Sequence, residues 1–145
     1  MNAMTKEEAI DFIRTEHYME WEEYSKTYNL SKLKMPACEI INRAKGVAGT
    51  AYYSLNKIEY NLPYVMQQGE KYKEVISHEL AHIICHHLYP HAKQAHGPEF
   101  RMILQSAGYK GSTYHNFNVK EAKNLARTTM LSVIDTLTDE ELAEF

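Results

Sequence analysis

Hydrophobic side chains recur every three or four residues along the first thirty positions of the chain, which is the spacing of an amphipathic helix. Thr5 followed by Glu8 is a capping-box pattern that marks the start of this helix. Because no partner motif surrounds His17, we expect a packed histidine there and not a ligand. The apolar stripe comprises Ile10, Ile13, His17, Trp21, Tyr24 and Tyr28.

A β-rich segment follows Pro36. Residues 38–43, 49–55 and 57–62 are short apolar and β-branched or aromatic runs bounded by turn formers, and they predict three strands. Lys45 and Gly46 form the first predicted turn, and Asn56 marks a hairpin between the second and third strands. Pro63 is expected to end the sheet. We therefore expect a small three-stranded antiparallel sheet.

A second long helix is predicted over residues 70–89, because no proline or glycine interrupts this stretch and Pro90 ends it. Helices are also expected over residues 98–107, ended by Gly108, and over residues 119–137, with a turn-rich loop at 111–118. The core face of the second helix would comprise Tyr72, Ile76, Leu80, Ile83 and His87. Since no repeat, low-complexity tract or linker is found, residues 1–145 are expected to form a single α+β domain.

The second helix carries an HExxH pentapeptide at residues 78–82. His78 and His82 project from neighbouring turns of one face, so both imidazoles can reach one zinc ion. Glu79 lies between them and can serve as general base toward a metal-bound water. Uncharged residues fill the variable positions from Val75 to Ile84, which suits the dry wall that a catalytic metal needs.

A catalytic zinc ion usually has three protein ligands and one position for water. His86 lies one further turn along the same helix face as His78 and His82. It is about 12 Å from His78 along the helix axis, too far for both to bind one ion easily. The third ligand is therefore expected beyond Pro90. A histidine just before the helix at 98–107 is best placed, since loop and helix both hold it. The candidates, in order of preference, are His96, His91 and Glu99.

At this point the sequence resembles a known family. The HELAH run at 78–82, thirteen intervening residues, and then His-Gly-Pro-Glu-Phe at 96–100 are similar to the SprT-like metalloprotease domain. In that family an HExxH is followed by a His-Gly-x-x-(Phe/Trp) element. Residues 49–53 and 57–61 are similar to the paired strands that lead into the family's active-site helix. The resemblance is strongest over residues 36–108, about half of the chain.

The resemblance implies a compact zincin-like fold with Glu79 as general base. Its zinc ligands would be His78, His82 and His96. Relatives such as Spartan degrade proteins crosslinked to DNA, so DNA–protein crosslink repair is also implied. Many bacterial members continue into a four-cysteine zinc ribbon. Only Cys38 and Cys85 occur in this sequence, neither in a CxxC pair, so we expect no such ribbon and less support for the DNA-linked role.

Composition narrows the cellular setting. A chain of 145 residues with 44% hydrophobic and 24% charged residues is ordinary for a soluble domain. No stretch approaches the roughly 20 apolar residues of a membrane span, and the first residues lack the apolar core of a secretory signal. Two isolated cysteines suit a reducing compartment. We therefore expect a cytoplasmic protein that does not engage a membrane.

Charge is unevenly distributed along the chain. The formal net charge of −3 argues against a strongly basic nucleic-acid binder. Residues 32–57, however, carry five bases and a single acid, Glu39, and tyrosines interleaved with them could stack single-stranded DNA bases. A solvated face with core or edge-strand tyrosines is the alternative. The residues concerned are Lys32, Lys34, Arg43, Lys45 and Lys57, with Tyr52 and Tyr53.

The predicted function is zinc-dependent hydrolysis of peptide bonds, in which Glu79 passes a proton from water to the leaving amine. A non-catalytic zincin-like module that binds DNA or protein is the alternative. The presence of Glu79 beside both histidines speaks against it, because a structural zinc needs no base. Zinc-dependent hydrolysis of another bond is a third option. The candidates for an oxyanion donor are Tyr109, Tyr114 and His115.

Overall fold

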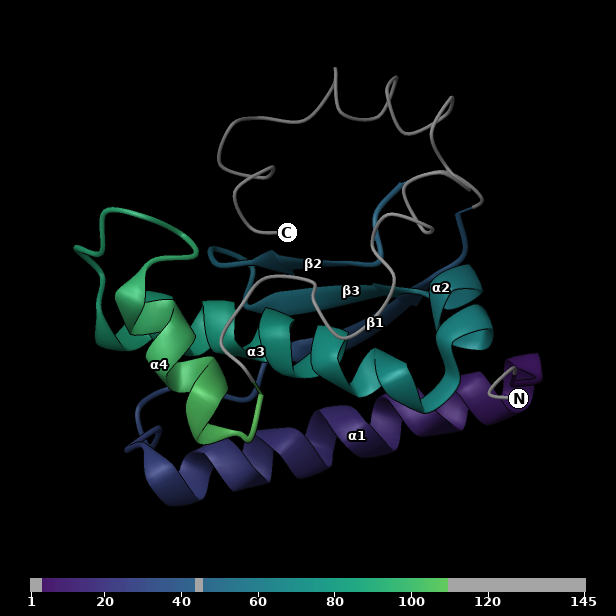
Figure 1. Ribbon diagram of the computed structural model, residues 1–145, viewed down its shortest axis with the longest axis horizontal. Coiled ribbons are helices and arrows are strands. Elements are labelled where there is room, and N and C mark those ends of the chain that lie inside the picture. Colours follow the sequence, from purple (N-terminus) through teal and green to yellow (C-terminus); the bar gives the residue numbers. More distant parts are fainter. Residues whose placement is uncertain (1–3, 44–45, 110–145) are drawn as a thin grey trace.

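The computed structural model describes residues 4–43 and 46–109, and its class is α+β (Figure 1). The predicted loop at 111–118 and helix at 119–137 lie outside the described residues. Two long helices, α1 and α3, pack against each other and against a small three-stranded sheet. The elements in chain order are α1 (Lys6–Thr27), β1 (Ala37–Ile41), β2 (Gly49–Tyr52), β3 (Lys57–Asn61), α2 (Leu62–Gln68), the 3₁₀ helix η1 (Gly69–Tyr72), α3 (Lys73–Leu88) and α4 (Pro98–Ser106).

The start of α1 matches the sequence pattern. The backbone N–H of Glu8 donates to the Thr5 hydroxyl at 3.2 Å, and the N–H of Thr5 donates to the Glu8 carboxylate at 2.9 Å. This reciprocal pair satisfies backbone donors that the first turn would otherwise leave open, so the predicted capping box is confirmed. The side chains that α1 buries are Ala9, Ile13, His17, Trp21 and Tyr24.

His17 is a packed histidine, as expected from the sequence. Its Nε2 lies 2.8 Å from the carbonyl oxygen of Pro36, and its Nδ1 lies 2.8 Å from the Tyr60 hydroxyl. A carbonyl can only accept, so Nε2 carries the proton and Nδ1 accepts from Tyr60. Burial lowers the pKa of His17, which keeps the ring neutral. The residue thus ties α1 to the sheet.

The sheet is mixed, and the prediction of an antiparallel sheet was wrong for β1. The strand order is β1-β3-β2, with β3 antiparallel to β2 and parallel to β1. The hairpin at Asn56, whose φ of 46° is left-handed, makes β2 and β3 antiparallel as expected. The hairpin inserts β3 between β2 and β1, which run in opposite directions. A strand antiparallel to β2 in that position must be parallel to β1.

Asn61, the last residue of β3, secures this arrangement. Its side-chain oxygen accepts from the backbone N–H of Arg43 at 3.0 Å, and its side-chain nitrogen donates to the carbonyl of Val47 at 3.1 Å. Asn61 is buried, so both bonds satisfy groups that water does not reach. One side chain therefore holds both ends of the connection between β1 and β2.

The segment between the sheet and α3 contains two helical pieces that were not predicted from the sequence. Pro63 was expected only to end the sheet, yet it lies in the first turn of α2, where a missing N–H costs nothing. Gly69, with a φ of 60°, ends α2 and starts η1. As a result α3 begins at Lys73, three residues later than the predicted start at residue 70.

Helix α3 is the centre of the described fold. Every residue from Glu74 to Cys85 is buried, on all sides of the helix. It packs against α1 on one side, β2 on another and α4 on a third. The prediction of one core face was therefore too narrow, since the face that bears His78 and His82 is also covered, and it was wrong for His87, which is exposed beyond the buried part of the helix. A helix hydrophobic or buried all round belongs to the middle of a domain.

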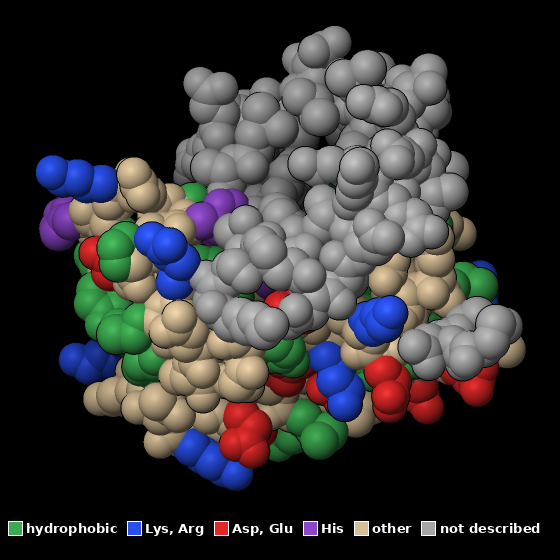
Figure 2. All heavy atoms as spheres, viewed as in Figure 1, with side chains coloured by type: hydrophobic (Ala, Val, Ile, Leu, Met, Phe, Trp, Pro, Cys, Tyr) green, Lys and Arg blue, Asp and Glu red, His purple; other side chains and the backbone are tan. Residues whose placement is uncertain are grey.

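The described surface is mixed in charge. Acidic side chains with interspersed lysines and arginines follow the outer side of α1, along the lower edge of the view (Figure 2). This agrees with the outward acidic face that the sequence pattern of α1 requires. None of the helices within residues 4–43 and 46–109 has the length and apolar character needed to cross a membrane.

Candidate metal centre

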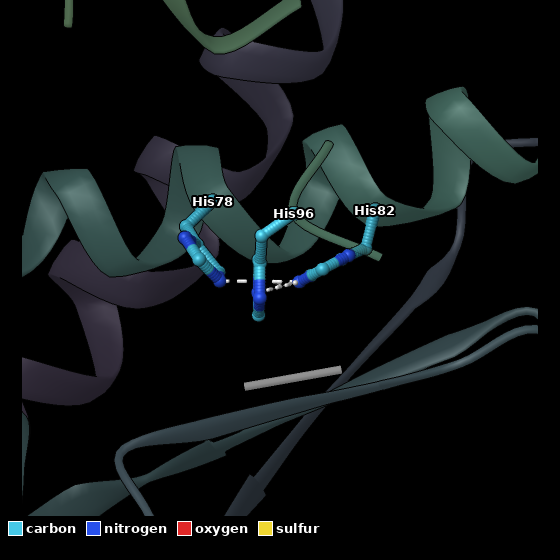
Figure 3. A group of neighbouring side chains, drawn as sticks. All are labelled: His78, His82 and His96. Atoms are coloured by element: carbon cyan, nitrogen blue, oxygen red, sulfur yellow. Dashed lines mark hydrogen bonds between the residues drawn. The ribbon is translucent and has the colours of Figure 1, made fainter. Parts of the chain in front are cut away.

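Three histidine side chains converge at one point beside α3 (Figure 3). His78 and His82 come from successive turns of α3, and His96 comes from the loop directly before α4. The Nε2 atom of His82 lies 3.1 Å from that of His78 and 3.0 Å from that of His96. His78 and His82 are buried and His96 is half-buried. Residues 14 positions apart in the chain thus share one small volume.

The spacing of these nitrogens fits a tetrahedral metal. Ligand nitrogens about 2.0 Å from a zinc ion at tetrahedral angles are about 3.3 Å apart. A hydrogen-bonded cluster fits less well, because the Nε2 of His82 faces two partners while an imidazole nitrogen offers either one proton or one lone pair. Three lone pairs directed at one cation account for both short contacts. The donor set can therefore hold a divalent metal and is compatible with zinc.

The protonation state of the rings also favours metal binding. Burial, followed by the neighbouring His78 and His96, lowers the pKa of His82 well below its usual range. Burial lowers the pKa of His96 to about 4. The rings of His82 and His96 are therefore neutral near pH 7, with lone pairs available to a cation.

Phe100 supports all three histidines. Its ring centroid lies 4.5 Å from that of His82, 4.9 Å from that of His78 and 5.1 Å from that of His96. Phe100 is fully buried in the first turns of α4, so the rings rest on a rigid apolar wall. Such a wall orients ligands and excludes water from the metal. The sequence analysis quoted Phe100 as part of a family element but assigned it no role.

Glu79 is buried in the same region. Its Oε2 lies 3.9 Å from the Nε2 of His78, so the carboxylate adjoins the point where the ligand nitrogens meet. The other side of Glu79 faces the start of β2. A Cβ atom built on Gly49 would lie 3.2 Å from the Cγ of Glu79 and 3.2 Å from a methyl of Val75. Glycine at this position therefore allows the strand and the carboxylate side chain to approach each other closely.

Buried polar contacts from α1 hold α3 in place near Ser77. The hydroxyl of Tyr24 on α1 lies 2.7 Å from the Ser77 hydroxyl and donates to the Ser77 carbonyl at 3.3 Å. Glu20, one turn earlier on α1, is largely buried beside them. Its burial, together with the Glu16 charge, raises the pKa of Glu20 to about 9. Glu20 is thus protonated near neutral pH. Because Ser77 precedes His78, these contacts fix the turn that carries His78.

The other candidate ligands lie elsewhere. His86, His87 and His91 are exposed, and neither His91 nor Glu99 belongs to the group of converging ligand atoms. His86 instead stacks on Tyr53, with ring centroids 4.2 Å apart. Cys85 is buried and does not belong to the group of converging ligand atoms.

Of the candidate oxyanion donors, the structure describes one. The hydroxyl of Tyr109 lies 3.5 Å from a carboxylate oxygen of Glu20 on α1. Tyr109 also lines a pocket with Glu16, Tyr24 and Ser106, away from the three histidines. Tyr114 and His115 lie outside the described residues.

The basic stretch of residues 32–57 is partly neutralised. The ammonium group of Lys57 lies 3.2 Å from Glu39 and 3.5 Å from Glu59, and it also sits 5.0 Å from the centre of the Tyr52 ring. The Tyr52 hydroxyl donates to Glu59 at 3.1 Å. Lys57 and Tyr52 are therefore engaged within the sheet. Lys32, Lys34 and Arg43 are exposed, and Lys45 lies outside the described residues.

Comparison with known proteins gives a consistent result. The SprT-like family model matches residues 17–123. Protein SprT of Pseudomonas putida is 27% identical over 100 residues, covering 67% of this chain and 61% of that protein. Protein SprT of Vibrio parahaemolyticus is 35% identical over 92 residues, covering 61% and 54%. Protein SprT of Actinobacillus succinogenes is 32% identical over 78 residues, covering 52% and 45%.

The chain thus aligns with less than two thirds of the length of each of these relatives. No solved structure matched the chain. The family match includes α3, the loop that carries His96, and α4, which together form the candidate metal centre. Since the match extends over most of the sequence, this chain belongs to the SprT-like family.

Proposed function

We propose that this protein is a zinc-dependent metallopeptidase with a zincin-like active site. The observation that carries the proposal is the convergence of three histidine nitrogens within 4.8 Å of one another, with a buried glutamate beside them. In this proposal the ligands are His78, His82 and His96, and Glu79 is the general base. A structural metal would need no such carboxylate, and structural zinc sites are usually closed by four protein ligands.

When bound, zinc would supply Lewis acidity toward a water molecule and toward the carbonyl of the peptide bond. Glu79 accepts a proton from the attacking water at a carboxylate oxygen and returns it to the leaving amine. The buried position of Glu79 keeps its carboxylate in a fixed place near the ligands, and the buried ring of Phe100 covers the histidine rings that it contacts. The chain's own residues therefore position the base and shield the site.

An extended peptide has a natural docking place beside this centre. In the described sheet β2 is an edge strand, paired only with β3, and it packs along α3. Main-chain hydrogen bonds to such an edge hold an unfolded segment without regard to its sequence. Proteins associated with DNA are the substrates that the family resemblance implies. We therefore propose unfolded or exposed segments of such proteins as substrates, with single-stranded DNA as a partner to be tested.

The test compares zinc-loaded wild type with Glu79→Gln on an unfolded protein substrate, with and without single-stranded DNA. Loss of a general base is expected to lower turnover about 10²- to 10⁴-fold, while zinc per chain stays unchanged. Elemental analysis of both proteins provides the control. Equal cleavage by both proteins would contradict the role of Glu79. A zinc-loaded wild type that cleaves nothing, yet binds DNA or a protein, would favour the non-catalytic module.

A further inference from the structure

A small cavity adjoins the metal centre on the side of α3 that follows His82. Its volume is about 150 Å³, and His82 forms part of its wall. The rest of its wall is formed by Tyr53, just after the end of β2, by the last turns of α3 and by the loop before His96. Its lining includes Tyr53, Cys85, Tyr89, Ala92 and Ala95, together with the polar side chain of Gln94. The cavity is therefore continuous with the candidate active site and is built by three separate segments.

The lining of this cavity is neutral. None of the described residues that line it is an aspartate, glutamate, lysine or arginine. One side is formed by the stacked rings of Tyr53 and His86, which are nearly parallel, with an interplanar angle of 3°. Small side chains, Ala92 and Ala95, lie in the loop segment of the lining and leave the space open. A lining of aromatic and small side chains that carries no aspartate, glutamate, lysine or arginine favours a neutral, mainly apolar group over a charged one.

The size of the cavity restricts what can enter. A cavity of roughly 150 Å³ can hold one benzene-sized group, as engineered cavities in another protein do. A single leucine, methionine or phenylalanine side chain has these dimensions. The volume is too small for a second side chain beside the first. The cavity is thus matched to one side chain of intermediate size.

The path of β2 leads from the base to this cavity. Gly49 at the start of β2 lies against Glu79, and Tyr53 just after its end stacks on His86, seven residues further along α3. Seven helical residues are about two turns. In an extended peptide paired with the edge of β2, alternate side chains point to the same face. A peptide paired with this edge would pass from the metal centre to the cavity, and one set of its alternate side chains would face α3, on which β2 packs.

We infer that this cavity receives the side chain of the substrate residue adjoining the cleaved bond, and that it selects leucine, methionine or phenylalanine there. The inference rests on the proposed peptidase function and adds a substrate preference to it. Tyr53 and Ala92 are the specificity-determining residues, since one provides an aromatic wall and the other leaves the space open. Neither residue is a metal ligand or the base in the proposed mechanism.

The test uses unstructured peptides that differ only in one central residue, which is leucine, phenylalanine, glycine or aspartate. Zinc-loaded wild type should cleave next to leucine or phenylalanine at least about tenfold faster than next to glycine or aspartate. Ala92→Leu fills the cavity and should abolish the preference for the larger residues. Tyr53→Ala opens it and should reduce discrimination. Leu55→Ala, on the same hairpin but 64% exposed and outside the cavity, is the matched control.

A second measurement does not depend on cleavage. Fluorescence anisotropy of the same labelled peptides with zinc-loaded Glu79→Gln should give tighter binding for leucine and phenylalanine, and Ala92→Leu in that background should remove the difference. Cleavage without side-chain preference, or a preference unchanged in both cavity variants, would overturn the inference. Selective binding with no cleavage by wild type would support the cavity and contradict the proposed function alone. Equal binding of all four peptides would overturn the cavity assignment.

Discussion

At the scale of single residues, the position of Glu79 depends on a glycine. A methyl group on Gly49 would press on the Cγ of Glu79 at 3.2 Å, closer than side chains normally pack. Gly49→Ala must therefore displace the carboxylate or the strand by a few tenths of an ångström. Displacements of a base by this amount lower reaction rates, and we expect kcat/KM to fall about three- to tenfold.

Steady-state cleavage kinetics of Gly49→Ala, with zinc content measured in parallel, check this prediction. Zinc content should equal that of wild type, because the atoms nearest to a Cβ on Gly49 belong to Glu79, Val75 and Glu59 and not to the three histidines. An unchanged kcat/KM would show that Glu79 does not need the space that glycine leaves. A loss of zinc instead would mean that the substitution acts on the ligands.

The three histidines that come together could be predicted from the sequence, but the residues that contact them and Glu79 could not. His78, Glu79 and His82 follow from helical spacing, because ligands four residues apart face the same side. His96 required a further inference about where the chain turns back. The roles of Phe100 and Gly49 depend on contacts between segments that lie far apart in the chain. Such contacts produce no periodic pattern in the sequence. The phenylalanine four residues after His96 was nevertheless visible as part of the family element.

At the scale of elements, the contact between α1 and α3 contains a protonated glutamate. The pKa of Glu20 is about 9 in the folded chain against 4.5 for an unperturbed glutamate, so between these values the folded state holds a proton that the unfolded state has released. The stability from this group is full below about pH 4.5 and is lost as the pH rises toward 9, by at most about 1.4 kcal/mol per pH unit. Glu20→Gln keeps the shape and removes the titration.

Thermal or urea unfolding across pH 5 to 9 checks this prediction, with zinc present throughout. Glu20→Gln should be more stable than wild type at pH 8, on the order of 1–3 kcal/mol, and the difference should shrink toward pH 5. Glu23→Gln is the matched control, because Glu23 is exposed on the same helix and pairs with Lys26 at the surface. Parallel pH curves for wild type and Glu20→Gln would contradict a protonated Glu20.

Some helices and strands could be predicted from the sequence and others could not, and each outcome has a physical reason. The capping box of α1 and the hairpin turn at Asn56 are local signals, and both are confirmed. Helix α2 was missed because Pro63 was interpreted as a terminator, whereas proline is equally suited to a first helical turn. The parallel pairing of β1 with β3 arises because the hairpin of β2 and β3 places β3 next to β1. The sequence of a single strand does not indicate which strand will lie beside it.

At the scale of the whole molecule, the candidate metal would join two separate parts of the described fold. Two ligands lie on the central helix α3, and the third lies in the loop that leads to α4. The charge pattern of the sheet gives less support to nucleic-acid binding than the sequence suggested, because Lys57 is paired with two glutamates. The three-histidine centre is therefore the main support for the proposed function.

The most direct test of that centre is zinc per chain, measured by elemental analysis after zinc loading and removal of free metal. Wild type and His91→Ala, the matched control with an exposed histidine in the same loop, should each hold close to one zinc ion. His96→Ala should fall below about 0.3, since two histidines alone do not complete a tight site. Full retention in His96→Ala, an equal loss in His91→Ala, or no zinc in wild type would contradict the proposed three-histidine metal centre.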